Sequence, residues 1–133
     1  MKYILLPIDG SKRSIKSIDL VKTLYKPDEV NISIVLVRED FDSIRSEADY
    51  EQIKQETMPF LDEVAGKLDG FKVNKHVRAG YAGDEILKFA EAENIDAIIM
   101  TKSTRKGWTQ MIGSVTTHIV KYAKCIVMII PEE

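Results

Sequence analysis

Short apolar runs alternate with longer amphipathic segments along this chain, and no other feature constrains its fold as strongly. Five runs rich in Ile, Val and Leu occupy residues 3–8, 30–37, 71–77, 95–100 and 125–130. Nearly continuous apolar strands are typical of a parallel sheet whose two faces are both covered by helices. The alternation therefore predicts an α/β domain with a doubly wound, five-stranded parallel sheet.

The intervening segments carry apolar side chains at helical spacing, which predicts helices over residues 12–25, 43–68, 84–93 and 111–122. Pro59 lies inside the second of these and is expected to kink or divide it, because proline removes a helical hydrogen bond. Ser11 is expected to cap the first helix, and Gly80 is expected to serve a turn. The strand at 71–77 alternates apolar with polar residues, which places it near an edge of the sheet.

Composition excludes several classes of function. The chain has 133 residues, 44% of them apolar, which is sufficient for a single domain with its own core. The formal net charge is −2 and no basic stripe appears, so nucleic-acid binding is not expected. The first apolar run is too short for a signal peptide or a membrane helix, which predicts a cytoplasmic protein with no membrane partner. Cys125 is the only cysteine, so an internal disulfide is excluded, and its apolar surroundings predict a core position.

Ligands of open parallel sheets bind beyond the carboxyl ends of the strands, where the winding reverses. Two unusual loops lie at such ends, residues 7–11 and 101–114. In the first, Asp9 could accept hydrogen bonds from a ribose or an adenine amino group, or merely cap a turn. In the second, Gly113 and Ser114 precede a helix, whose backbone amides favour an anion, although a plain turn and cap has the same signature. Basic side chains of Lys102, Arg105 and Lys106 add positive charge.

No nucleophile, base and orienter can be recognised together, and no cluster of metal ligands appears, so a catalytic role is not expected. His76 is flanked by Lys75 and Arg78, which predicts a solvated surface position. His118 could approach a phosphate, but a packed or exposed helical position is favoured. Trp108 could cover a pocket, pack on a helix or meet a partner protein, and the sequence does not decide among these roles.

Five motifs recur here in a specific order: residues 4–11, 80–86, 96–100, 113–115 and 122–130. Together they resemble the universal stress protein family, with its UspA-like, Rossmann-like fold of the adenine nucleotide alpha hydrolase type, along essentially the whole chain. The resemblance implies strand order 3-2-1-4-5 and a homodimer formed through residues 125–131. It also implies a nucleotide pocket. The matching residues are Pro7, Asp9, Val37, Met100, Thr101, Gly113, Ser114 and Val115.

The phosphate loop departs from the pattern of ATP-binding members of that family. They carry glycine, two residues, glycine, nine residues, then glycine with Ser or Thr, whereas this chain has Thr101 and Thr104 at the first two glycine positions and only eight residues before Gly113. Threonine resists the backbone conformations that glycine allows. ATP or AMP, with Mg²⁺, remain the candidate ligands, and ATP is expected to bind weakly or not at all.

The resemblance implies a stress-response regulatory or binding protein that acts as a homodimer. The alternative is an adenine-nucleotide sensor or slow ATPase that uses the altered loop in a new conformation.

Overall fold

Five parallel strands form one sheet in the order β3-β2-β1-β4-β5, which confirms the expected topology. The computed structural model describes residues 2–10, 13–39, 42, 44–101 and 114–131. The strands are β1 (Lys2–Ile8), β2 (Val30–Arg38), β3 (Lys72–Ala79), β4 (Ala97–Thr101) and β5 (Ile126–Ile130). Because β2 and β4 flank the central β1, the winding reverses between β1 and β4 at the carboxyl edge of the sheet.

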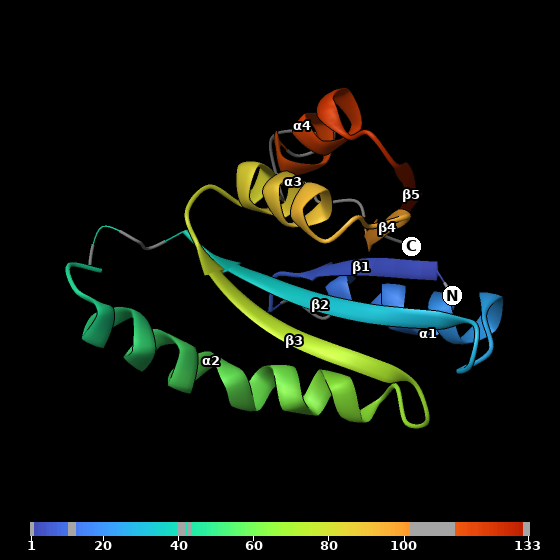
Figure 1. Cartoon of the computed structure of the whole chain (residues 1–133), viewed down its shortest axis with the longest axis horizontal. Coiled ribbons are helices and arrows are strands. Elements are labelled where there is room, and N and C mark those ends of the chain that lie inside the picture. Colours follow the sequence, from blue (N-terminus) through green and yellow to red (C-terminus); the bar gives the residue numbers. More distant parts are fainter. Residues whose placement is uncertain (1, 11–12, 40–41, 43, 102–113, 132–133) are drawn as a thin grey trace.

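Helices cover both faces of the sheet (Figure 1). A short 3-10 helix, η1 (Arg13–Ile15), leads into α1 (Lys16–Leu24), and α1 shares one face with α2 (Glu47–Gly66). The other face is covered by α3 (Ala82–Ala92) and α4 (Ser114–Tyr122). Ile4 and Leu6 of β1 pack into the first layer and Leu5 into the second, and all three are fully buried. This alternation explains why β1 reads as continuously apolar.

The helix α2 runs unbroken through Pro59, so the expectation that proline divides it was wrong. Pro59 lies on the exposed side, where water can bond the carbonyl that proline leaves without a donor. Leu61 and Val64 are fully buried and anchor the helix on the sheet just beyond this point. Ser46 caps its start by accepting a hydrogen bond from the Asp49 backbone N–H at 3.2 Å.

The edges of the sheet agree only partly with expectation. β3 is an edge strand, as predicted, and Gly80 has a positive φ of 144° in the turn that follows it. Cys125 was expected in the core but is only half-buried, because it precedes β5 at the other edge. Burial still raises the pKa of its thiol, with Asp96 adding to the effect.

Ser11 lies outside the described residues. In the described part of the chain, no helix is both long and apolar enough to span a membrane.

Candidate functional site

A cavity of about 350 Å³ opens at the carboxyl edge of the sheet, where the winding reverses. Its volume lies at the lower end of the range of small-molecule sites, about 300–1,000 Å³. Its walls come from the ends of β1, β2 and β4, from η1, from the first two turns of α3 and from the first turn of α4. The lining residues are Pro7, Ile8, Asp9, Ser14, Val35, Leu36, Val37, Arg38, Glu39, Ala82, Ile86, Met100, Thr101 and Val115.

One side of the cavity is an apolar slot on the α3 and α4 face of the sheet. Val35 and Met100 come from β2 and β4, and Ile86 comes from α3; each is almost fully buried. Val37 and Val115 are partly buried and pack on the same cluster. A flat apolar ring is the kind of group that such a slot can hold.

The other side of the cavity is polar. Glu39 Oε2 accepts a hydrogen bond from the Ala82 backbone N–H at 3.1 Å, so a carboxylate meets the positive end of α3. Arg38 Nη1 donates to Thr57 Oγ1 at 3.0 Å, which ties the guanidinium to α2. Asp9 and Ser14 complete this polar side.

Thr101 also lines the cavity, as the last residue of β4. Only 7% of Thr101 is exposed, and its Oγ1 makes no hydrogen bond within the described residues. A buried hydroxyl normally has a partner, because leaving it without one costs about 1–3 kcal/mol. The Thr101 hydroxyl is therefore a buried group in the wall of the cavity that has no hydrogen-bond partner among the described residues.

The structure brings together six of the eight residues named from the sequence: Pro7, Asp9, Val37, Met100, Thr101 and Val115. Ser114 begins α4 but is exposed and does not line the cavity. Gly113 lies outside the described residues, as do Lys102, Thr104, Arg105, Lys106 and Trp108.

Sequence reasoning missed Arg38, Glu39 and Ser14. Arg38 and Glu39 follow Val37 at the carboxyl end of β2, so the rule that ligands bind beyond strand ends, applied to this strand, could have found them. Ser14 comes from η1 and carries no comparable signal.

His118 belongs to the contact between α3 and α4. Its Nε2 lies 2.8 Å from Asp84 Oδ1, and its ring lies 4.9 Å from that of Tyr122. The side chain packs directly on Gly83, where an added Cβ would lie 2.7 Å from His118 Cδ2. The packed helical position favoured from the sequence is therefore the observed one.

His76 does not occupy the solvated position expected for it. It is half-buried, and its ring lies 4.7 Å from that of Phe89 on α3. Arg78 lies two residues further along β3, on the same face, with its guanidinium 5.4 Å from the Phe89 ring. Burial lowers the pKa of His76 below its ordinary value of 6.5, and Arg78 and Lys54 lower it further against the opposing effect of Glu93.

This shift predicts a loss of stability in mild acid. Because the folded state lowers the pKa of His76, the unfolded chain binds a proton more readily, and stability is lost as pH falls below about 6.5. The urea midpoint should therefore fall more steeply between about pH 6.5 and 5 in the natural chain than in His76→Gln, since the variant has no imidazole to protonate. Parallel pH profiles for the two proteins would contradict this account.

The described residues contain no group of three or more His, Cys, Asp or Glu side chains that could hold a metal ion.

Comparison with known proteins gives the family. The model of the universal stress protein family matches residues 1–131. Universal stress protein MJ0531 of Methanocaldococcus jannaschii is 26% identical over 138 residues, covering 97% of this chain and 81% of that protein. The solved structure of MJ0577, from the same organism, has a TM-score of 0.85 at 25% identity and covers 99% of this chain and 96% of that one.

Two further solved structures share the fold and hold nucleotides. One is a universal stress protein in complex with cAMP, with a TM-score of 0.76 and 15% identity, covering 99% of this chain and 98% of that one. The other is a family member from Arabidopsis thaliana with AMP bound, with a TM-score of 0.69 and 14% identity, covering 100% of this chain and 93% of that one. Because the family model matches nearly its whole length and the strand order agrees, this chain belongs to the universal stress protein family.

Proposed function

We propose that this chain is a stress-response binding protein of the cytoplasm that holds an adenine nucleoside or AMP in the cavity at the carboxyl edge of the sheet. The observation that carries the proposal is the cavity itself. It joins an apolar slot, formed by side chains such as Val35 and Met100, to a polar side that includes Asp9. An adenine ring suits the slot, and a ribose suits the polar side.

Relatives support the choice of ligand class. Solved structures with the same fold hold cAMP and AMP, and both molecules are adenosine monophosphates. The position of the cavity also agrees with the general rule for open parallel sheets, because it lies at the reversal between β1 and β4.

ATP is proposed to bind weakly or not at all. A polyphosphate needs backbone amides that approach it closely, which glycine permits and β-branched threonine resists. Thr101 has its side chain at the first such position, and that side chain is buried in the wall of the cavity. Glu39, on the polar side, adds a carboxylate that repels phosphate.

A thermal-shift titration tests the ligand. A ligand at about 100 times its dissociation constant stabilises the folded state by roughly 2.7 kcal/mol. Millimolar adenosine or AMP should therefore raise the midpoint temperature of thermal unfolding clearly. Mg-ATP should raise it much less, and uridine should leave it unchanged. A large shift with Mg-ATP would instead favour the nucleotide sensor or slow ATPase, and phosphate release would then separate these two.

A substitution that fills the apolar slot tests whether adenosine binds there. Val37→Trp should abolish the adenosine shift, because the indole would occupy the space between β2 and α3. Val120 is 55% exposed on α4 and is not among the residues that line the cavity, so Val120→Trp should leave the shift unchanged. If adenosine shifted the melting temperature of both variants equally, the ligand would have to bind outside this cavity.

We further propose that the protein acts as a homodimer through β5. This strand is at the edge of the sheet, and its five residues are all apolar, with Ile126 63% exposed. An apolar edge strand promotes aggregation unless another chain covers it, and a two-fold dimer is the commonest closed arrangement.

A further inference from the structure

Phe89 on α3 is contacted by two basic side chains of β3. The His76 ring lies 4.7 Å from the Phe89 ring, and the Arg78 guanidinium lies 5.4 Å from it. Phe89 itself is only 3% exposed. A cation is attracted to an aromatic face, so the guanidinium is well placed there, and the neutral imidazole packs against the same ring as a flat, largely apolar group. The contact between β3 and α3 therefore holds one cation and one neutral ring.

This contact lies next to the candidate site. Ile86 precedes Phe89 by about one turn of α3 and lines the cavity. Val35 of β2 pairs in register with His76 and lines the cavity as well. Ile86, Phe89 and Val35 belong to one buried cluster. Because buried side chains are closely packed, a change in how α3 rests on His76 would move part of the cavity wall.

The charged groups around His76 disfavour its protonation, with one exception. Arg78 follows on the same face of β3, Lys54 comes from α2 and Glu93 follows the end of α3, while β2 presents the apolar Val35. Burial and Arg78 are the main reasons why the pKa of His76 is below its ordinary value; Lys54 adds to their effect and Glu93 opposes it. Protonation therefore places a second cation in a contact that disfavours it, whereas the same ring in water takes up a proton without this cost.

We propose that the contact between His76 and Phe89 is a pH-sensitive switch that controls the shape of the cavity. At neutral pH the uncharged ring holds β3 and α3 together. In mild acid the imidazolium leaves Phe89 for water, α3 loosens on the sheet, and the wall around Ile86 no longer fits the ligand. Because the ligand binds the form with the neutral ring, its affinity is complete above about pH 6.5 and falls as the pH drops below this value. Only the effect on ligand affinity rests on the proposed function of the cavity.

Adenosine affinity, measured by calorimetry at about pH 7.5 and about pH 5.5, tests the switch, because this range spans the ordinary titration of histidine and leaves adenosine uncharged. The natural chain should bind more weakly at the lower pH, by at most about tenfold per pH unit for one titrating group. His76→Gln should lose most of this pH dependence, whereas His118→Gln, which removes the other histidine, should keep it. The carboxylates of Asp9 and Glu39 are present in all three proteins and cannot cause a difference between them. Circular dichroism at both pH values would verify that folded proteins are compared.

The ligand-free protein supplies a second readout. Nuclear Overhauser contacts between the ring protons of His76 and Phe89 should be present at about pH 7.5 and lost at about pH 5.5, where the imidazole is charged. The contact of His118 with Tyr122, whose ring centroids are 4.9 Å apart, is the control. It should persist, because Asp84 Oδ1 lies 2.8 Å from His118 Nε2 and remains a partner for the charged ring.

Each contrary result has a distinct meaning. Equal pH dependence of adenosine affinity in the natural chain and in His76→Gln would overturn this inference and leave the proposed function in place. A contact between the His76 and Phe89 rings that survives protonation of His76 would also overturn this inference alone. Failure of the natural chain to bind adenosine at either pH would overturn the proposed function, and the ring contact would still decide whether β3 and α3 separate in acid.

Discussion

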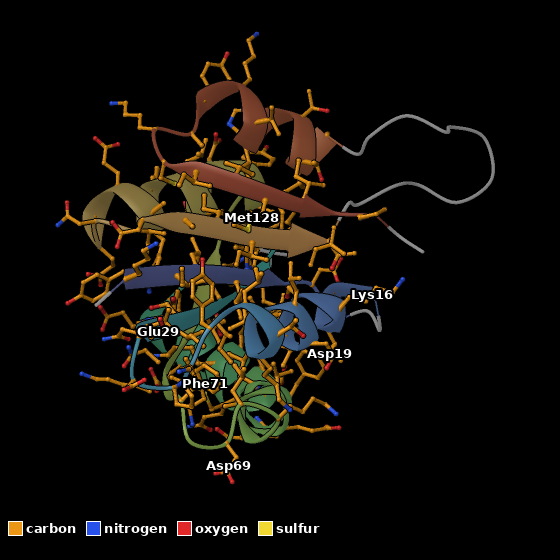
Figure 2. The ribbon with its side chains drawn as sticks, turned by 90° about the vertical axis from the view of Figure 1, so that its right-hand side faces the viewer. Lys16, Asp19, Glu29, Asp69, Phe71 and Met128 are labelled. Atoms are coloured by element: carbon orange, nitrogen blue, oxygen red, sulfur yellow. The ribbon has the colours of Figure 1, made fainter. Side chains whose placement is uncertain are left out.

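A chain carrying both Ile126→Lys and Met128→Lys is expected to sediment as a monomer at concentrations where the natural chain is a dimer. Both residues are on β5, at the edge of the sheet, and strand alternation turns them toward the face that α1 shares. Figure 2 shows Met128 on a part of that face that α1 does not cover. Lysine at these positions would place like charges opposite one another across the two-fold axis, and lysine is the residue that natural edge strands use to prevent pairing.

The choice of positions within β5 matters. Val127 and Ile129 pack toward α3 and α4, so lysine there would disturb the core as well as the interface. Ile126 is exposed, whereas Met128 is partly buried and packs against the core cluster on the α1 face, so circular dichroism must first show that the double variant is folded. Leu24, which is 46% exposed at the end of α1, provides the control, since Leu24→Lys should remain a dimer. A natural chain that already sediments as a monomer at micromolar concentration would refute the proposed assembly.

The fold was predictable because each of its strands is either apolar throughout or alternates regularly. Ile4, Leu5 and Leu6 are all fully buried, as continuous burial of a central parallel strand requires. Pro59 shows the limit of local rules. Its effect on α2 depends on which side of the helix faces water, and that side is set by the packing of Leu61 and Val64 on the sheet.

The candidate site was predictable where it depends on strand ends and not where it depends on contacts between distant segments. Asp9, Val37 and Met100 lie at or just beyond the ends of three strands, and topology alone brings them together. The hydrogen bond between Glu39 and the Ala82 N–H joins segments 43 residues apart, and no local sequence pattern predicts it. His76 was misread because its charged neighbours were weighed more heavily than the alternation that turns it toward Phe89.

Replacing Gly83 with valine is expected to destabilise the protein by about 3 kcal/mol, the upper part of the usual range for overpacking a buried contact. Gly83 is a buried residue in the first turn of α3, and its φ is not positive, so its backbone alone does not demand glycine. Space is the constraint. An added Cβ would lie 2.7 Å from His118 Cδ2 and 3.2 Å from His118 Cβ, so rotating the imidazole would not relieve the clash and α4 would have to move.

Gly66 is the matched control, because it is a helical glycine at the exposed end of α2 with nothing within 4 Å of an added Cβ. Gly66→Val should change the free energy of unfolding by less than about 0.5 kcal/mol in urea titrations. The two substitutions are chemically identical, so any difference between them reports the contact between α3 and α4. Equal effects would show that the helix termini, and not this contact, respond to the added side chain.

The displacement of α4 should also reach the cavity. Val115 lines the cavity one turn before His118 in the same helix, so Gly83→Val should weaken adenosine binding although Gly83 itself does not line the cavity. Adding His118→Ala removes most of the ring that the valine meets, while sacrificing the 2.8 Å contact with Asp84. The double variant should therefore recover stability and adenosine affinity relative to Gly83→Val, with a coupling of about 1–2 kcal/mol in the double-mutant cycle. Additive effects of the two substitutions would mean that α3 and α4 accommodate the valine without using His118.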